Sequence, residues 1–406
     1  MAQAPQSLYD AVVRHAVDRS GAQALVFGDE VWTYGELIKD VERCAAFLTE
    51  RGVRRGDRVA MASTPRPEFL ITLLASLRLG AIWAGLNPKY KAGEFAHILK
   101  DSTPRLVVSI TRHPDGDPVS ERVADAIDQT QKSTLLLRIG AGADQDDDWA
   151  ACVSSTTATP PDDAGRAARD PAVLVYTSGS TGAPKGAVLP HDAFTHCGGV
   201  LAVADIAGIG LLDHPRMVCN LPINHVGSLT DTIGAVLIAG GTVILEERFE
   251  PHRIGALVRE HQATLLCGVP LMLQAILASG EMHASDFASI KAVGWGGAAL
   301  PAPVLDAYAE LGVALFTTYG LTEGGSISTV TRIGDSRDRL LHSVGAVTPD
   351  QELRIVDARG DQTPTGEPGE VQVRGAGVML EYFNNPAATA EAFTADGWLR
   401  TGDIGR

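Results

Sequence analysis

A loop rich in glycine, hydroxyl and lysine side chains carries the clearest chemistry in this 406-residue sequence. An apolar run at residues 173–176 is typical of a buried strand, and the loop follows it directly. Glycines let backbone N–H groups converge on one point, hydroxyls add donors, and a lysine adds a mobile positive charge. We therefore expect a polyphosphate site formed by Thr177, Ser178, Gly179, Ser180, Thr181, Gly182 and Lys185.

The loop departs from the common P-loop of nucleotide-binding proteins. That pattern has a glycine before the lysine and a serine or threonine after it. Here Pro184 precedes Lys185 and Gly186 follows it, so no hydroxyl stands beside the lysine to hold a metal. A plain solvated turn is the alternative interpretation, because such clusters are common between strands. The density of donors beside a lysine favours phosphate binding.

A second segment with chemical potential, TTYGLTEGG at residues 317–325, also follows an apolar run. Open α/β sheets place ligands at the carboxyl ends of their strands. Tyr319 offers a ring that can stack on a base, and Thr322 offers a donor for a phosphate. Glu323 offers a hard oxygen ligand suited to Mg²⁺. The alternative is a glycine-rich turn with a solvated glutamate and a packing tyrosine.

These two segments resemble motifs of the acyl-adenylate-forming superfamily, which includes acyl-CoA synthetases, adenylation domains of nonribosomal peptide synthetases and firefly-type luciferases. The string YTSGSTGAPKG at 176–186 resembles its phosphate-binding signature, and YGLTE resembles its Tyr-Gly-x-Thr-Glu motif. Three more segments match in order: LPINHVGS at 221–228, GWGGAALP at 294–301 and GWLRTGD at 397–403. The resemblance covers residues 173–403.

The resemblance implies a nucleotide site. Asp403 accepts hydrogen bonds from the ribose hydroxyls, and Glu323 holds Mg²⁺. The other residues expected to contact ATP beyond the phosphate loop are Gly296, Gly297, Ala298, Thr318, Tyr319, Gly320 and Thr322. The catalytic residues that it implies are Thr177, Lys185, His225, Thr322 and Glu323.

The resemblance also implies a pocket for a carboxylic acid, with His225 beside the incoming carboxylate. The expected lining is His225, Gly227, Ser228, Trp295, Gly320, Gly324 and Gly325. A structural histidine and a core tryptophan are the alternatives for His225 and Trp295. Amino-acid-activating relatives carry an aspartate in this segment, whereas this sequence has no carboxylate until Asp231, which disfavours an amino acid substrate.

The implied activity has two steps. A fatty, aryl or arylalkanoic acid reacts with ATP to give an acyl-adenylate and pyrophosphate, and coenzyme A then displaces AMP. The alternatives are delivery to a carrier-protein thiol, a non-catalytic adenylate-binding module and luciferase-like oxidation. The family continues with a domain that supplies a catalytic lysine, whereas the sequence stops at Arg406, three residues after Asp403. We therefore expect a truncated protein that binds ATP and acid but adenylates slowly.

The composition restricts partners and compartment. The formal net charge is −15 without a basic run, which argues against nucleic acid and anionic membranes. The five cysteines are widely spaced and include no C-x-x-C pair, so a reducing cytoplasm is expected. The sequence lacks the features of a signal peptide and any apolar run near the ~18 residues of a membrane span. A homodimer is compatible with these features.

The elements that must position these residues alternate between strand and helix patterns. The sequence predicts an α/β fold with two mainly parallel sheets flanked by helices, plus a small β-barrel-like subdomain. The predicted subdomains are 1–170 (ending in a surface linker at 141–170), 171–341 and 342–406. Thr33 and Glu36 predict a capping box. Strands are expected at 58–62, 106–110, 135–138, 218–221, 243–246, 264–267, 292–294, 314–317, 352–356 and 370–374, and helices to residue 51, at 68–79 and at 92–100.

Overall fold

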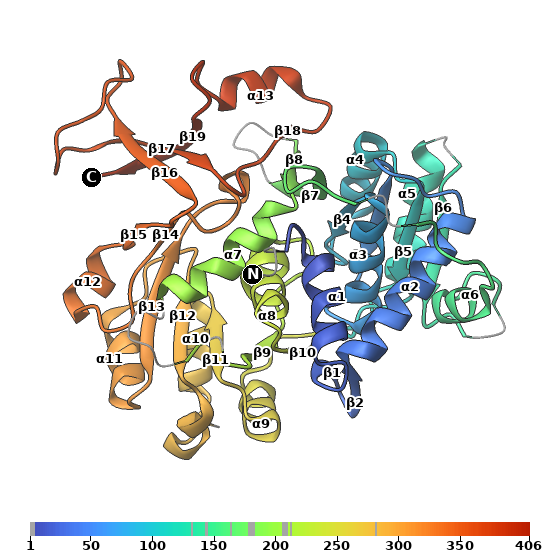
Figure 1. The fold of residues 1–406 in the computed structure, drawn as a ribbon, viewed down its shortest axis with the longest axis horizontal. Helices are drawn as coiled ribbons and strands as arrows, with labels where there is room; N and C mark the ends of the chain where they lie inside the picture. The colour runs from blue at the N-terminus through green and yellow to red at the C-terminus, as the bar shows by residue number, and fades with distance from the viewer. Residues whose placement is uncertain are drawn as a thin grey trace.

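The computed structural model describes residues 5–130, 133–142, 145–162, 165–177, 183–204, 210–211, 213–280 and 282–406. These residues form three sheets. The N-terminal half and the C-terminal half each contribute a large helix-flanked sheet, and a smaller sheet built from the end of the chain lies at one corner (Figure 1). The predicted α/β fold is confirmed.

The largest sheet has nine strands, and its central six are parallel. Antiparallel strands complete both of its edges. In sheet order the strands are β15 (Ala346–Val347), β14 (Thr329–Val330), β13 (Ala314–Tyr319), β12 (Ala292–Trp295), β11 (Leu265–Gly268), β9 (Arg216–Cys219), β10 (Thr242–Leu245), β1 (Gln23–Phe27) and β2 (Glu30–Thr33).

The second sheet has seven strands, of which five are parallel and two are antiparallel. In sheet order the strands are β18 (Glu381–Tyr382), β8 (Lys185–Pro190), β7 (Pro171–Thr177), β4 (Ile82–Leu86), β3 (Arg58–Ala62), β5 (Leu106–Ile110) and β6 (Leu135–Ile139). Strands β7 and β8, which flank the predicted phosphate loop in the sequence, therefore lie next to the edge strand β18 of a mainly parallel sheet.

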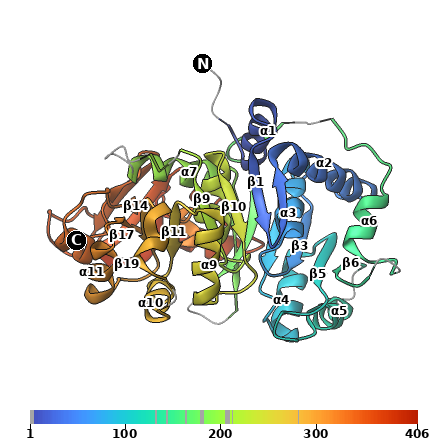
Figure 2. The same ribbon diagram turned by 90° about the horizontal axis from the view of Figure 1, so that it is seen from below.

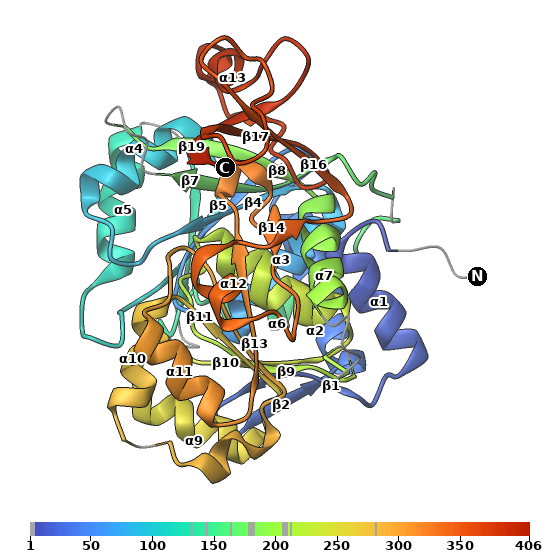
Figure 3. The same ribbon diagram turned by 90° about the vertical axis from the view of Figure 1, so that its left-hand side faces the viewer.

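The third sheet joins β16 (Gln351–Val356), β17 (Gly369–Gly375) and β19 (Leu399–Gly405) in antiparallel order. It lies at the top of the molecule in Figure 3, on the side of β7 and β8. The expected small β subdomain is present. In the part of the chain that the structure describes, its strands form an open sheet and not a closed barrel.

Hydrophobic cores cover both faces of the nine-stranded sheet because side chains alternate along each strand. Val218, Ile244 and Leu266 pack into a core shared with helices α9 (Pro251–His261), α10 (Pro270–Ala278) and α11 (Ala302–Glu310). Met217 and Val243, on the opposite face, pack into the larger core that also contains the seven-stranded sheet. Figure 2 shows α9, α10 and α11 along one side of the molecule.

Helices connect most of the parallel strands. They are α1 (Leu8–Asp18), α2 (Tyr34–Glu50), α3 (Pro67–Leu79), α4 (Ala92–Ser102), α5 (Val119–Thr130), α6 (Trp149–Ser155), α7 (Asp192–Ala204), α8 (Ala235–Ile238), α9 (Pro251–His261), α10 (Pro270–Ala278), α11 (Ala302–Glu310), α12 (Arg337–His342) and α13 (Pro386–Ala392). A π-helix, η2 (Gly227–Gly234), precedes α8, and short 3₁₀ helices occur at η3 (Ala284–Ser289) and η4 (Thr322–Gly324).

Two features differ from the sequence-based expectation. The segment 141–170 contains helix α6, whose buried Trp149 and Val153 anchor it although its flanks are polar. Strand β1, from the predicted first subdomain, pairs with β10 in the other large sheet, and β2 extends that sheet by pairing with β1. The sheets thus exchange strands across residue 170, and the domain boundaries remain predictions.

Candidate functional site

The ends of the predicted phosphate loop face each other across the β7–β8 hairpin. Thr177 is the last residue of β7, Lys185 is the first of β8, and the two are paired in register. The Thr177 hydroxyl lies 3.5 Å from the Lys185 carbonyl oxygen. The predicted residues Ser178, Gly179, Ser180, Thr181 and Gly182 lie outside the described residues. The lysine enters a strand, whereas the lysine of a P-loop opens a helix.

Glu323 contacts this hairpin, although it lies in the loop that follows β13 of the nine-stranded sheet. The Thr177 hydroxyl donates to Glu323 Oε1 over 3.1 Å. Glu323 lies in η4, four residues after β13 ends, and its carbonyl oxygen accepts from the Met379 N–H at 2.9 Å. Two segments that are 146 residues apart in the sequence therefore converge on one carboxylate.

Tyr382 is a site residue that the sequence did not reveal. Its hydroxyl donates to Glu323 Oε1 over 2.9 Å, and the Lys185 ammonium lies 5.0 Å from its ring centroid. Burial and the neighbouring Glu323 carboxylate raise the pKa of the Tyr382 hydroxyl, so it stays a donor. Strand β18 delivers this ring by pairing with β8. A lone tyrosine before an Asn-Asn-Pro turn carried no chemical signal of its own.

Tyr319 and Asp403 form a second contact of the candidate site. The Tyr319 hydroxyl donates to Asp403 Oδ2 over 2.7 Å, joining the end of β13 to β19. Burial, and then the hydrogen bond to Asp403, raise the pKa of Tyr319. The Asp403 N–H donates to the Thr401 hydroxyl at 3.1 Å, which orients the turn. The Tyr319 ring, expected to stack on the base, and the Asp403 carboxylate, expected to bind the ribose, therefore lie side by side.

The segment after β12 lies against the end of β13. A Cβ at Gly296 would come within 2.8 Å of the Thr318 hydroxyl oxygen, and Gly297 adopts a positive φ of 81°. Ala298 follows these two glycines. Trp295 is only 3% exposed and belongs to a hydrophobic core, and its place in the acid pocket remains a prediction.

Most of the glycines expected to line the acid pocket instead permit contacts within the chain. A Cβ at Gly320 would lie 1.6 Å from the Ser326 carbonyl oxygen, and one at Gly325 would lie 2.4 Å from Gly377. A Cβ at Gly324 would lie 2.8 Å from the Leu321 side chain. Their missing side chains therefore give no measure of the room available to a substrate.

His225 lies at the surface, two residues before the π-helix η2. The Gly227 N–H donates to His225 Nδ1 over 3.0 Å, so the neutral ring carries its proton on Nε2. Ser228 is buried, and its hydroxyl donates to the Leu221 carbonyl at 3.1 Å. π-Helical turns frequently occur at functional sites. The segment places an exposed imidazole above a buried, hydrogen-bonded turn.

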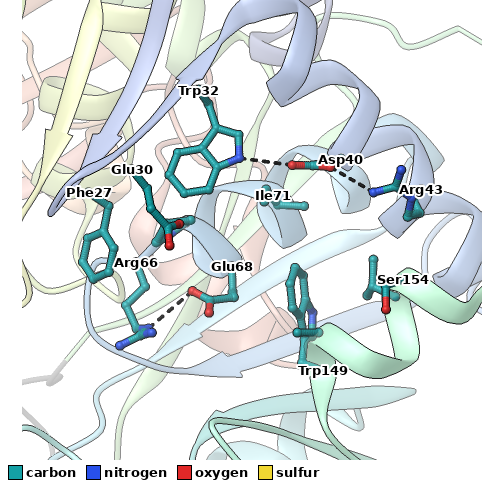
Figure 4. Close-up of a pocket in the computed structure, with 13 residues that line it drawn as sticks. Phe27, Glu30, Trp32, Asp40, Arg43, Arg66, Glu68, Ile71, Trp149 and Ser154 are labelled. Carbon is teal, nitrogen blue, oxygen red and sulfur yellow. Dashed lines mark hydrogen bonds and ion pairs between the residues drawn. The ribbon is translucent and has the colours of Figure 1, made fainter. Parts of the chain in front are cut away.

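A separate pocket of about 280 Å³ contains none of the predicted site residues (Figure 4). It lies between the β1–β2 hairpin, α2, α3 and α6, with Trp32 and Trp149 in its wall. Its polar groups bond one another: Trp32 Nε1 donates to Asp40 over 3.1 Å, and Arg66 pairs with Glu68 at 3.3 Å.

The described residues contain neither a candidate membrane span nor a cluster of metal-binding side chains. Among them, no helix is both long and apolar enough to pass through a bilayer. Within those residues there is also no group of three or more His, Cys, Asp or Glu side chains that could bind a metal by itself. Mg²⁺ is commonly held by one or two carboxylates together with substrate phosphates and water, so the prediction at Glu323 does not require such a group.

Comparisons with known proteins identify one family. The family described as AMP-binding enzyme matches residues 12–383, so Asp403 lies beyond the matched range. The chain is 34% identical over 394 residues to feruloyl-CoA synthase of Amycolatopsis sp., covering 97% of this chain and 74% of that protein. It is 31% identical over 392 residues to indoleacetate–CoA ligase of Aromatoleum aromaticum, with coverage of 97% and 74%.

Solved structures agree with these matches. The inhibitor-bound N-terminal domain of FACL13 from Mycobacterium tuberculosis superimposes with a TM-score of 0.86 at 27% identity, covering 98% of this chain and 96% of that one. ATP-bound MatB from Rhodopseudomonas palustris gives a TM-score of 0.85 at 26% identity, covering 99% and 76%.

Proposed function

Because the chain belongs to the AMP-binding enzyme family, we propose that it activates a carboxylic acid with ATP and passes the acyl group to coenzyme A. The observation that carries the proposal is the hydrogen bond between Thr177 and Glu323. It joins the predicted phosphate loop to the predicted magnesium ligand across two sheets. The names of the relatives, which are acid–CoA ligases, support the same reaction.

The reaction has two displacements. A carboxylate oxygen of the acid attacks the α-phosphorus of ATP, and the bond from that phosphorus to pyrophosphate breaks. The thiol of coenzyme A then attacks the acyl carbon, and AMP leaves. Such chemistry depends on positioning and charge neutralisation. Lys185 would neutralise the departing phosphates, and Asp403 and Tyr319 would hold the ribose and the base.

The Mg²⁺ assignment rests on the two oxygens of Glu323. Thr177 and Tyr382 both donate to Oε1. Among the described residues, no hydrogen bond or ion pair of the Glu323 side chain involves Oε2. One carboxylate oxygen is therefore held in place while the other stays available to a hard cation, which fits the expected ligand. Bound Mg²⁺ would neutralise charge on the phosphates of ATP.

For the acid, we propose an aromatic or arylalkanoic carboxylate. Feruloyl-CoA synthase and indoleacetate–CoA ligase are named for such acids. The carboxylate would lie beside His225 and the acyl group against the start of η2. A fatty acid is the second candidate, because the glycine contacts do not define the size of the pocket.

Pyrophosphate exchange into ATP tests the first step. Ferulate, indoleacetate, 4-chlorobenzoate and octanoate are offered separately with Mg²⁺-ATP, and the expected result is exchange that depends on at least one aromatic acid. Lys185→Ala should lower the exchange rate by about 10²–10³, the usual effect of removing a group that stabilises transition-state charge. Binding of ATP without exchange for any acid would favour a non-catalytic adenylate-binding module.

Two parts of the proposal concern the thiol that accepts the acyl group and the rate at which these 406 residues exchange pyrophosphate. Release of AMP on addition of coenzyme A, compared with addition of a phosphopantetheinylated carrier protein, separates the two thiol acceptors. The chain aligns to 74% of feruloyl-CoA synthase. We propose that the 406 residues alone exchange pyrophosphate more slowly than that longer relative does. Equal rates in parallel assays would refute this part.

A further inference from the structure

Asp231 connects the two halves of the candidate site. It lies in η2, the π-helix that starts two residues after His225. Its Oδ2 accepts the Ser326 hydroxyl at 2.6 Å, and its Oδ1 accepts the Thr230 hydroxyl at 2.8 Å and the Cys197 thiol at 3.5 Å. The Asp231 carboxylate therefore connects its own helix η2, which follows His225, to helix α7 and to Ser326.

Ser326 closes the loop that carries Thr322 and Glu323. It has a positive φ of 80°, directly after Gly325 with a φ of 81°. A serine in this left-handed region is strained unless its surroundings hold it in place. Its N–H donates to the Leu321 carbonyl at 3.1 Å, and the hydrogen bond to Asp231 secures its side chain.

The position of Ser326 also governs the nucleotide side. Its carbonyl oxygen occupies the space where a Cβ of Gly320 would lie, at 1.6 Å from that point. The Ser328 N–H donates to the Tyr319 carbonyl at 2.8 Å. A shift of Ser326 would therefore displace the backbone that carries the Tyr319 ring, and with it the contact to Asp403.

The hydrogen bonds at Asp231 offset the cost of placing a carboxylate in this interior. Burial raises the pKa of the Asp231 carboxyl, while hydrogen bonds from Ser326, Thr230 and Cys197 and the charge of His225 lower it. Loss of the Ser326 donor would leave this carboxylate less well satisfied, so the pair favours a single arrangement.

We propose that Asp231 is a positioning residue whose hydrogen bond to Ser326 couples binding of the carboxylic acid near His225 to binding of ATP near Tyr319 and Glu323. This inference rests on the proposed function. Both ligands act on one hydrogen-bonded unit, so each should increase the affinity for the other by the same factor.

Calorimetric titration of α,β-methylene-ATP measures that factor with and without ferulate, or the panel acid that supports the fastest exchange. The wild-type chain should bind the nucleotide about 5–150-fold more tightly in the presence of acid, the usual range of coupling between sites. Asp231→Ala and Ser326→Ala should each bring the factor to within about twofold of one. The double variant should lose no more than either single variant, because both remove the same interaction.

Thr232→Val is the matched control. Thr232 lies one residue further along η2, and its hydroxyl donates to the Ser228 carbonyl within the helix at 3.0 Å. It should retain the wild-type factor. Melting temperatures of all variants identify a purely structural role, which would lower stability without changing the factor.

The outcomes distinguish this inference from the proposed function. Wild-type protein that binds both ligands without coupling, or Asp231→Ala protein that keeps the full factor, overturns the inference alone. Wild-type protein that binds neither ATP analogue nor any panel acid overturns the proposed function and the inference together.

Discussion

At the scale of single residues, Glu323 shows how a motif acquires geometry. The sequence places it after a tyrosine, a glycine and a threonine, and this pattern predicts a magnesium ligand. The structure adds two donors to the same oxygen, Thr177 at 3.1 Å and Tyr382 at 2.9 Å. Those contacts orient the carboxylate before any ligand arrives, which favours binding because less ordering is needed.

Replacement of Glu323 by glutamine should weaken the dependence of ATP binding on Mg²⁺. The amide keeps the size and one acceptor but loses the charge, so the Mg²⁺ concentration for half-maximal binding should rise about tenfold, or about 1.4 kcal/mol. Titration of ATP at graded Mg²⁺ concentrations measures this half-maximal Mg²⁺ concentration. Tyr382→Phe removes a donor and keeps the carboxylate, so it should change the midpoint much less; an equal change would argue against Glu323 as the metal ligand.

At the scale of elements, short spacings predicted local structure well. Thr33 and Glu36 form the expected capping box of α2: the Thr33 hydroxyl accepts from the Glu36 N–H at 3.2 Å, and Glu36 accepts from the Thr33 N–H at 2.9 Å. Most predicted strands lie within two residues of their observed bounds. The π-helix η2 was not predicted, because an extra residue per turn leaves no distinct hydrophobic period.

Thr33→Ala should lower the free energy of unfolding by about 1 kcal/mol, since the first turn of α2 loses a side-chain acceptor. Denaturant unfolding followed by circular dichroism provides the measurement. Thr49→Ala, near the other end of the same helix, is the control. Its hydroxyl only donates to the Ala45 carbonyl, and alanine has the higher helix propensity, so stability should change little. A larger loss at Thr49 than at Thr33 would contradict this account of the cap.

At the scale of the whole molecule, a buried histidine links folding to pH. His191 is 0% exposed at the junction of β8 and α7, and among the described residues neither ring nitrogen has a hydrogen-bond partner. Burial, and then the charge of Arg166, lower its pKa from 6.5 to about 4, while Asp170 opposes the shift. The folded state therefore disfavours the charged ring.

The stability that this histidine contributes is fully present above pH 6.5 and is lost as the pH falls through about 4. Between those values the free energy of unfolding should decrease by up to about 3 kcal/mol because of this group. His191→Leu should flatten the profile in that window, as measured by denaturant unfolding at a series of pH values. His252→Gln, at a side chain that is 64% exposed, should leave the profile unchanged. An unaltered slope in His191→Leu would exclude this origin of acid sensitivity.

The candidate site was predicted in part. Thr177, Lys185, Tyr319, Glu323 and Asp403 all belong to contacts at the predicted motifs, because each motif combines a strand end with a chemically distinctive side chain. Tyr382 and Asp231 were not assigned a role, since neither lies in a pattern of that kind. Gly320 and Gly325 accommodate backbone from Ser326 and Gly377, so these glycines do not define the shape of the acid pocket.

Local order along the chain was therefore enough to identify the α/β class, the cap of α2 and the family, and it predicts the phosphate loop. These features depend on residue type and on spacings of a few positions, which the sequence records directly. Only the tertiary structure decided that β1 and β2 join the sheet of β10, that Tyr382 reaches Glu323, and that Asp231 holds Ser326. Such pairings depend on how segments far apart in the sequence pack against one another, and no pattern of closely spaced residues specifies that packing.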